Sequence, residues 1–197
     1  MHLMLFNSLQ FLIFFPIVTA TYYIVPQKLK NYWLLITSYY FYMCWNAKYA
    51  LLLLFSTVVT WLSGLLLQKI KDGTSENQAK ETCKKLVVVV CFGVNLAILF
   101  FFKYFNFALG ILEQGLQLIH IQLNRPVFDI VLPVGISFYT FQALGYTIDV
   151  YRGEINAEKN IFQYALFVSF FPQLVAGPIE RSKNLLEQLA VNKKSLI

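Results

Sequence analysis

The sequence predicts an all-α protein, a polytopic bundle of transmembrane helices. Of its 197 residues, 58% are hydrophobic and 13% are charged, about half the charged share of a soluble domain. The mean hydropathy is +0.59. Charges gather in short stretches between long neutral ones, which is typical of a membrane protein with several spans rather than of a soluble core.

Neutral stretches of about 20 residues are candidate spans, because a helix of that length crosses the hydrocarbon core of a bilayer. They are residues 3–25, 32–47, 49–68, 86–107 and 130–150, with a sixth candidate at 161–179. Lys48 alone separates the second stretch from the third, so a tight hairpin is expected there. Residues 69–85 form the clearly polar linker. No internal repeat divides the sequence, so residues 1–197 are expected to form a single membrane domain.

Lysine and arginine counts in short loops predict the orientation of the bundle. With the N-terminus outside the cell, Lys28, Lys30 and the five lysines of residues 69–85 lie in the cytoplasm. Lys48 and Arg125 are then left outside. The sequence therefore predicts a multi-pass protein of the plasma membrane, with its most basic loops in the cytoplasm.

The last candidate span breaks this charge pattern. A complete crossing by residues 161–179 would carry the basic residues that follow it to the outside. This segment contains Pro172, Gly177 and Pro178, and proline removes a backbone donor from a helix. A broken helix is tolerated in a membrane where protein or a water-filled cavity surrounds it. We therefore expect a bent or re-entrant segment here.

Charge and motifs exclude several classes of function. The net charge is +6, but the lysines lie between apolar runs, so basic loops explain them better than nucleic-acid binding does. His2 and His120 have no partner arranged in the sequence, and no hydrolase or metalloprotease motif is present. From the residues alone we assign no catalytic residue, no metal and no bound cofactor.

One candidate span carries a polar stripe. In "PVGISFYTFQALGYTIDVYRG", residues 133–153, the spacing of Tyr139, Gln142, Tyr146 and Asp149 places them on one helical face. Polar groups facing lipid are costly, so this face is expected to meet protein or water. It could pack against neighbouring helices or form the wall of a cavity or tunnel. Asp149 could also pair with Arg152, three residues further on.

Two long motifs resemble the membrane-bound O-acyltransferase family. They are residues 133–153 and "FVSFFPQLVAGPIER", residues 167–181. The bacterial branch of alginate O-acetyltransferase-like and D-alanyl-transfer proteins is the more similar one. "MLFNSLQFLIFFPIV" (residues 4–18) and "FFFKYFNF" (residues 100–107) also resemble that branch, so the resemblance covers nearly the whole chain.

The resemblance implies a helical bundle around a tunnel through a thinned membrane centre. It implies transfer of an acyl group from a cytoplasmic thioester, acetyl-CoA or an acyl carrier protein, to a hydroxyl of an extracytoplasmic polysaccharide or wall polymer. Acetyl and D-alanyl donors both remain open. The implied partners are the bilayer, the acyl donor or its carrier protein, and extracytoplasmic acetylation proteins.

The resemblance also suggests roles for particular residues. Tyr139, Gln142, Tyr146 and Asp149 would line the tunnel or bind substrate, and Pro172, Gly177 and Pro178 would shape the bent segment beside them. Arg181 would lie at the cytoplasmic mouth near the anionic donor, or would anchor the chain to lipid headgroups.

The sequence departs from the family pattern in one respect. The family's Arg-Trp-His-type stretch, which supplies the base for the acceptor hydroxyl, would follow the Gly-Pro-Ile-x-Arg region, and the sequence ends at Ile197 without it. We expect an N-terminal portion of a longer enzyme that transfers no acyl group by itself. The alternatives are a small non-enzymatic membrane protein that assists assembly or transport, and a channel.

Overall fold

The architecture is helical throughout the residues that the structure describes. The computed structural model describes residues 8–44, 46–73, 78–117, 133, 135–176 and 182–191. Within these ranges every regular element is a helix and no strand is present, which confirms the all-α fold class. The elements are α1 (Leu9–Ile24), the 3₁₀ turn η1 (Gln27–Leu29), α2 (Lys30–Met43), α3 (Ala47–Asp72), α4 (Gln78–Gln117), α5 (Ile136–Arg152), α6 (Ile161–Ser169), α7 (Phe171–Ala176) and α8 (Ser182–Val191).

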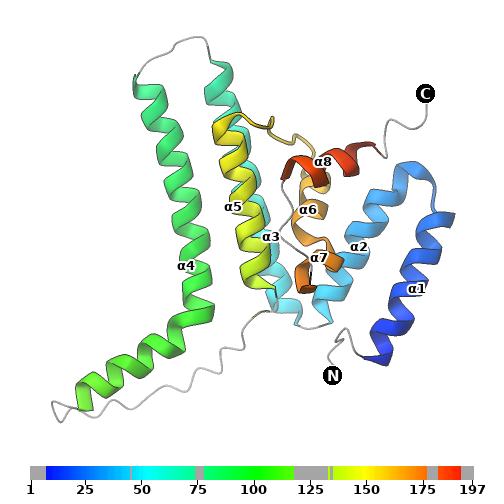
Figure 1. The fold of residues 1–197 in the computed structure, drawn as a ribbon, viewed down its shortest axis with the longest axis horizontal. Helices are drawn as coiled ribbons and strands as arrows, with labels where there is room; N and C mark the ends of the chain where they lie inside the picture. Colours follow the sequence, from blue (N-terminus) through cyan, green and yellow to red (C-terminus); the bar gives the residue numbers. More distant parts are fainter. Residues whose placement is uncertain are drawn as a thin grey trace.

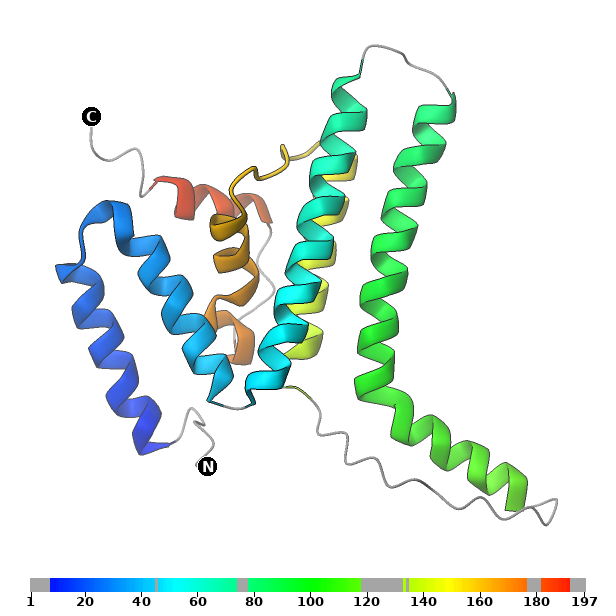
Figure 2. The same ribbon diagram turned by 180° about the vertical axis from the view of Figure 1, so that it is seen from behind.

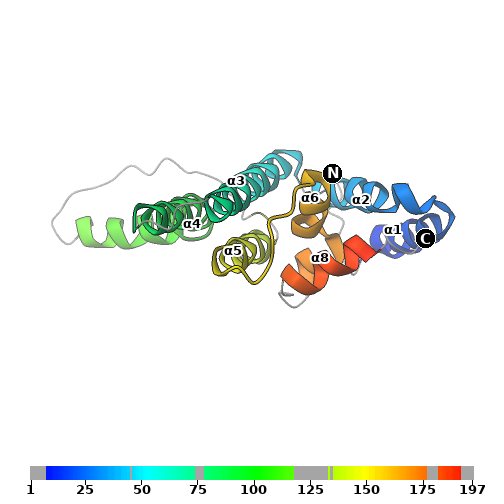
Figure 3. The same cartoon turned by 90° about the horizontal axis from the view of Figure 1, so that it is seen from above.

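The helices form a flattened array. Figure 1 shows α1 and α4 at its two edges, with α2, α3 and α5 between them and α8 lying across one end. Figure 2 shows the same arrangement from behind, with α5 partly covered by α3. Seen from above in Figure 3, α5 and α8 lie in front of a row formed by the other long helices. The main core lies where α5 meets α3 and α6, around buried residues such as Leu53, Tyr146 and Phe167.

Two helices are long and apolar enough to cross a membrane. They are α3, with 26 residues, and the 28-residue part of α4 from Gln78 to Phe105. A helix that is apolar all round either is buried in the core of a protein or faces lipid. Only 17% of the most apolar stretch of α4 is buried inside the protein. Leu86, Val89 and Phe100 of α4 are each more than half exposed. This combination supports a membrane location.

The other helices are shorter. The 16-residue α1 is apolar, α2 has 14 residues and α5 has 17. α1 falls within the candidate span 3–25, whereas α2 and α5 overlap the spans 32–47 and 130–150, because α2 begins at Lys30 and α5 ends at Arg152. Complete crossings by these segments stay a prediction, as does the single-domain organisation. Beyond its long straight part, the C-terminal end of α4 turns away from the array (Figure 1).

Aromatic packing attaches α1 to the array. The Phe14 ring lies 6.0 Å from that of Phe41 on α2 and 5.7 Å from that of Phe171 on α7. Phe41 and Phe171 are themselves buried, together with Val18. The first turn of α1 is capped by Ser8, whose hydroxyl accepts a hydrogen bond from the amide of Phe11. A small second core therefore joins α1, α2 and α7.

Candidate functional site

Two glycines define the ends of α5. Gly135 precedes the helix with a φ of 72°, and Gly153 follows it with a φ of 78°. A side chain is strained in this left-handed region, so glycine is favoured at both positions. The amide of Glu154 then donates to the carbonyl of Asp149, 2.9 Å away. The polar stripe is thus carried by a helix with a fixed beginning and end.

Three of the four predicted stripe residues are buried. Tyr139, Gln142 and Tyr146 have exposed fractions of 1%, 4% and 0%. The exposed side of α5 lies elsewhere, at Phe138 and Phe141. The expectation that the stripe meets protein is therefore confirmed for these three residues, and their role in lining a tunnel stays a prediction.

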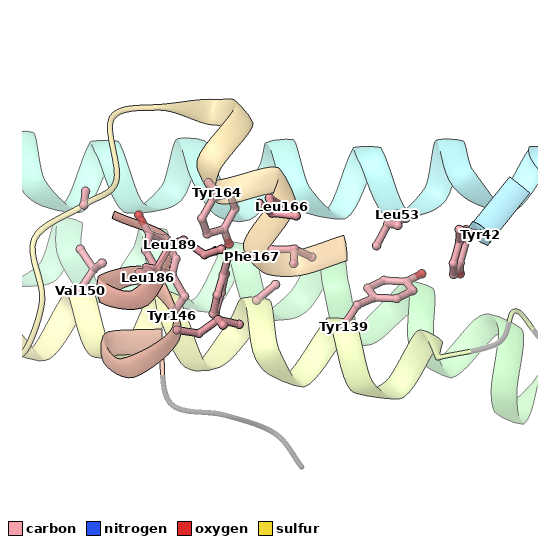
Figure 4. Close-up of a cluster of buried hydrophobic side chains, with 14 of the residues drawn as sticks. Tyr42, Leu53, Tyr139, Tyr146, Val150, Tyr164, Leu166, Phe167, Leu186 and Leu189 are labelled. Atoms are coloured by element: carbon pink, nitrogen blue, oxygen red, sulfur yellow. The ribbon is translucent and has the colours of Figure 1, made fainter. Parts of the chain in front are cut away.

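Tyr139 reaches the end of α2. Its ring lies 6.4 Å from that of Tyr42, edge to face, and Figure 4 shows the Tyr139 side chain directed toward Tyr42. Both hydroxyl oxygens are buried without a hydrogen-bond partner of normal geometry among the described residues. Buried hydroxyls normally have a partner, which is often an ordered water.

Gln142 contacts the break between α6 and α7. Its Nε2 donates to the carbonyl of Phe167, 2.8 Å away, and to Oε1 of Gln173 at 3.2 Å. In a continuing helix the Phe167 carbonyl would accept from the amide of Phe171, but that amide donates to Ser38 Oγ on α2, 3.3 Å away. The side chains of α5 and α2 therefore replace a backbone hydrogen bond that the break removes.

Pro172 explains the position of this break. A continuing helix would require the amide of residue 172 to donate to the carbonyl of Val168. Proline has no such donor, and its ring clashes with the preceding turn. The residues of 161–176 accordingly form two short helices separated at Phe170. A re-entrant path for this segment stays a prediction.

Tyr146 fills a gap that a glycine leaves on α3. A Cβ atom added to Gly64 would lie 2.8 Å from the hydroxyl oxygen of Tyr146. The Tyr146 ring also lies 4.5 Å from that of Tyr164 on α6, whose hydroxyl donates to Thr60 Oγ1, 2.8 Å away. Figure 4 shows Tyr146, Tyr164 and Phe167 close together between α5 and α6. Gly64 thus permits the close approach of α3 and α5.

Three side chains hold the loop between α5 and α6. The Tyr146 hydroxyl accepts from the amide of Glu158 at 2.9 Å. Trp61 Nε1 donates to the Glu158 carbonyl at 2.8 Å, and Gln68 Oε1 accepts from the amide of Ala157 at 3.3 Å. The loop backbone is therefore fixed by α3 and α5 at both of these residues.

A surface pocket of about 360 Å³ lies beside this loop. Its lining includes Gly153, Glu154, Glu158 and, from α8, Lys183. Asp149 is half-buried on the adjacent turn of α5. Arg152 lies 3.8 Å from the carboxylate of Glu154, so the pairing with Asp149 that the sequence suggested is not the one observed.

A hydrogen bond between the exposed Glu81 and the half-buried Tyr151 connects α4 with the end of α5. The Tyr151 hydroxyl donates to Glu81 Oε1, 3.0 Å away. This bond, aided by the neighbouring Lys84, lowers the pKa of Glu81. In turn it raises the pKa of Tyr151, because the phenolate would lose the bond and face the carboxylate. Glu81 precedes the candidate span 86–107 and Tyr151 follows 130–150.

Sequence reasoning missed a second set of polar groups, on α3 and α4. Ser56 Oγ donates to Asn95 Oδ1 at 2.5 Å, and Asn95 Nδ2 donates to the Cys91 carbonyl at 2.9 Å. Cys91 Sγ also lies 3.6 Å from Thr147 Oγ1 on α5. A repeat of small polar residues on α3, at positions 56, 60 and 63, was the available signal.

The remaining predicted residues lie elsewhere. Pro172 is half-buried beside a groove between α1 and α8. Gly177, Pro178 and Arg181 lie outside the described residues, as do both histidines. Within the described ranges, no group of three or more histidine, cysteine, aspartate or glutamate side chains could hold a metal ion.

Comparison with known proteins gives a clear set of relatives. No family model matches the chain, and no solved structure matches it. The probable alginate O-acetylase AlgI of Pseudomonas putida is 39% identical over 189 residues, and that of Pseudomonas aeruginosa is 37% identical over 186. The peptidoglycan O-acetyltransferase of Helicobacter pylori is 30% identical over 215 residues.

These matches cover most of this chain and a smaller share of each relative. Each covers 94% of the chain, but only 37%, 34% and 38% of the three relatives respectively. The chain therefore spans about a third of the length of the curated relatives it matches. The resemblance indicated by the two motifs is confirmed: over nearly its whole length, this chain is homologous to alginate O-acetylases and to a peptidoglycan O-acetyltransferase.

Proposed function

We propose that this chain is the N-terminal part of a membrane O-acyltransferase. The complete enzyme would transfer an acetyl group from a cytoplasmic thioester to a hydroxyl of an extracytoplasmic polysaccharide or cell-wall polymer. The observation that carries the proposal is the identity of 30% to 39%, over 94% of the chain, to relatives named as alginate or peptidoglycan O-acetylating proteins. Those names favour acetyl over D-alanyl transfer.

The distribution of charge supports a multi-pass orientation in the plasma membrane. Basic residues gather at the end of the array where α3 meets α4 and where α8 lies, at positions 69, 71, 80, 84, 85, 152 and 183. Lys28 and Lys30 lie at the same end, near η1, whereas Lys48 lies at the opposite end. By the positive-inside rule the basic end faces the cytoplasm.

Helix length supports a thinned membrane around the site. At 1.5 Å per residue, the 14 residues of α2 span about 21 Å and the 17 residues of α5 about 26 Å. The hydrocarbon core of an ordinary bilayer is about 30 Å thick. A shorter distance between the two faces would help a cytoplasmic donor and an external acceptor to meet.

The pocket beside the loop is the place that we propose for the donor. It lies at the basic end of the array. Lys183 lines it, and the ammonium of Lys71 is 3.2 Å from the position of a Cβ on Gly153. These cations would attract the phosphates of acetyl-CoA or an acidic carrier protein, while Glu154 and Glu158 would limit the net attraction.

In the proposed reaction the acceptor hydroxyl oxygen attacks the thioester carbonyl carbon. The hydroxyl proton passes to a general base, the carbon–sulfur bond breaks, and the departing thiolate takes up that proton to leave as the thiol. The family resemblance assigns that base to a histidine beyond this sequence. The role of the described residues is therefore to position the bent segment and the walls of the path, through Gln142, Tyr146 and Tyr139.

A chimera tests the proposal. The chain would replace the matching third of the Pseudomonas putida relative, and O-acetyl groups on the exported polymer would be measured in cells that lack their own enzyme. Restored acetylation supports the proposal, and the 197-residue chain expressed alone should give none. A chimera that reaches the membrane in normal amounts but acetylates nothing would favour the non-enzymatic assembly or transport role.

A further inference from the structure

A separate apolar groove lies where α1, α2, α7 and α8 meet. Its volume is about 440 Å³, and its lining includes Val18, Tyr22, Leu34, Phe171 and Leu189. No aspartate or glutamate lines it in the part of the chain that the structure describes. The groove is distinct from the α5 stripe and from the loop pocket, and the proposed function does not use it.

The groove is built into the fold. Val18, Phe171 and Leu189 are 4%, 2% and 6% exposed, so its floor is part of the packed interior. Asn31 on α2 donates from Nδ2 to the Leu189 carbonyl, 3.1 Å away, and so attaches α8 to α2. One wall is α1, which carries Val18 on its inner side and exposed apolar residues such as Leu12 and Ile13 on its outer surface. If α1 lies in a membrane, lipid therefore surrounds the side of α1 that borders the groove.

One cation contacts a residue that lines the groove, and a second lysine precedes it by two positions in the chain. Lys30 Nζ is 4.7 Å from the centre of the Tyr22 ring, and Tyr22 lines the groove. Lys28 lies in η1, two residues earlier, and is exposed. Among the described side chains, neither ammonium lies within ion-pair distance of a carboxylate. A hollow that is apolar along its length and cationic at one end is complementary to a molecule with an acyl chain and an anionic head.

We propose that this groove binds an anionic phospholipid. One acyl chain lies against Val18, Phe171 and Leu189, and the phosphate lies near Lys28 and Lys30. Lysines close to the cytoplasmic face of a membrane attract anionic lipids, and the positive-inside rule places these two at that face. A second copy of the chain placed on the groove would bring two cationic ends together, which disfavours that occupant.

The experiment uses the full chain in nanodiscs that contain equal amounts of phosphatidylglycerol and phosphatidylcholine. Lipids that stay on the protein after gentle extraction are identified by native mass spectrometry. The matched pair is Thr19→Trp and Ala20→Trp, because both positions are exposed on α1 but only Thr19 lines the groove. Thr19→Trp should remove the retained lipid, and Ala20→Trp should keep it.

A charge pair tests the headgroup. The double variant Lys28→Gln, Lys30→Gln should lower the preference for phosphatidylglycerol roughly tenfold, whereas Lys48→Gln, at the other end of the array, should leave it unchanged.

If Thr19→Trp fails to fold, the unmodified chain is treated with a phosphatidylglycerol that carries a photoreactive acyl chain. Cross-links should then map to α1 and α8.

Three outcomes would overturn the proposal. The first is equal lipid retention by the two tryptophan variants, or cross-links spread evenly over α3 and α4. The second is equal retention of the anionic and the zwitterionic lipid by the unmodified chain. The third is a lipid-free dimer that Thr19→Trp dissociates, since a second copy would then occupy the groove.

Discussion

The Gln142 side chain of α5 donates a hydrogen bond to the carbonyl oxygen of Phe167, 2.8 Å away, at the point where α6 gives way to α7. One amide therefore attaches the polar stripe to the broken segment. The two halves of the family resemblance, residues 133–153 and 167–181, meet at this bond.

Replacing Gln142 with leucine should destabilise the broken segment. The substitution leaves the Phe167 carbonyl without its donor in a buried position, which costs about 1–3 kcal/mol. The free energy of unfolding in detergent micelles would be measured, together with acetylation by the chimera, and both should fall. Phe141→Leu, on the exposed neighbouring position, serves as the control. Unchanged stability in Gln142→Leu would show that water replaces the amide.

Replacing Gly64 with alanine should force α3 and α5 apart. The new methyl group would lie 2.8 Å from the Tyr146 hydroxyl oxygen and from its Cε1 atom, and overpacking of this kind costs about 1–3 kcal/mol. Gly93→Ala is the matched control, because a Cβ there meets nothing within 4 Å and alanine favours the helix by up to about 1 kcal/mol. Thermal unfolding of the two variants should therefore shift in opposite directions. A Gly64→Ala protein as stable as Gly93→Ala would contradict the close packing.

The contact between Glu81 and Tyr151 should weaken at both extremes of pH. The folded pKa of Glu81 is lowered, so its contribution is present above the unfolded carboxyl pKa and is lost as the pH falls through the lower folded value. The folded pKa of Tyr151 is raised, so its contribution is present below the unfolded phenol value and is lost as the pH rises through the higher folded one. Hydrogen exchange near the end of α5 should respond to both changes. Glu81→Gln should remove the acidic response, and its persistence in that variant would assign it to another group.

Replacing Trp61 with phenylalanine should loosen the loop between α5 and α6. The indole N–H bond to the Glu158 carbonyl, 2.8 Å long, is lost while most of the ring volume stays. A hydrogen bond of this kind contributes about 0.5–1.5 kcal/mol. Limited proteolysis within residues 153–160 should become faster. Trp33→Phe is the comparison, because its indole bond, to the Val18 carbonyl, is 3.4 Å long and lies between α1 and α2. Equal cleavage of this loop in both variants would refute the specific role of Trp61.

Much of the fold was accessible from composition and periodicity. Low charge and long neutral stretches indicated helices in a membrane, and the three-four spacing placed Tyr139, Gln142 and Tyr146 on a buried face. These signals are local, since each depends on residues within a few turns of one another. Proline chemistry also indicated an interruption near Pro172.

The partners of those residues could not be predicted in the same way. Ser38 and Phe171 are 133 positions apart, and Trp61 and Glu158 are 97 apart, so their contacts depend on which helices become neighbours. The role of Gly64 is equally non-local, because the sequence around this glycine does not indicate that the ring of Tyr146, on another helix, packs against it. The predicted pairing of Asp149 with Arg152 was wrong, because α5 ends at Arg152 and the chain that follows brings the carboxylate of Glu154 to 3.8 Å from the guanidinium.

The bonds from Ser38 and Gln142 to the interrupted segment also impose an order on assembly. Ser38 and Gln142 leave the ribosome well before Phe171 does. Until the later residues emerge, Ser38 lacks the donor that the Phe171 amide supplies, and Gln142 lacks the acceptor that the Phe167 carbonyl supplies. The broken segment in turn needs both side chains for hydrogen bonds that its own backbone does not make. During biogenesis, α2 and α5 should therefore stay close to the insertion machinery until residues 161–176 dock between them.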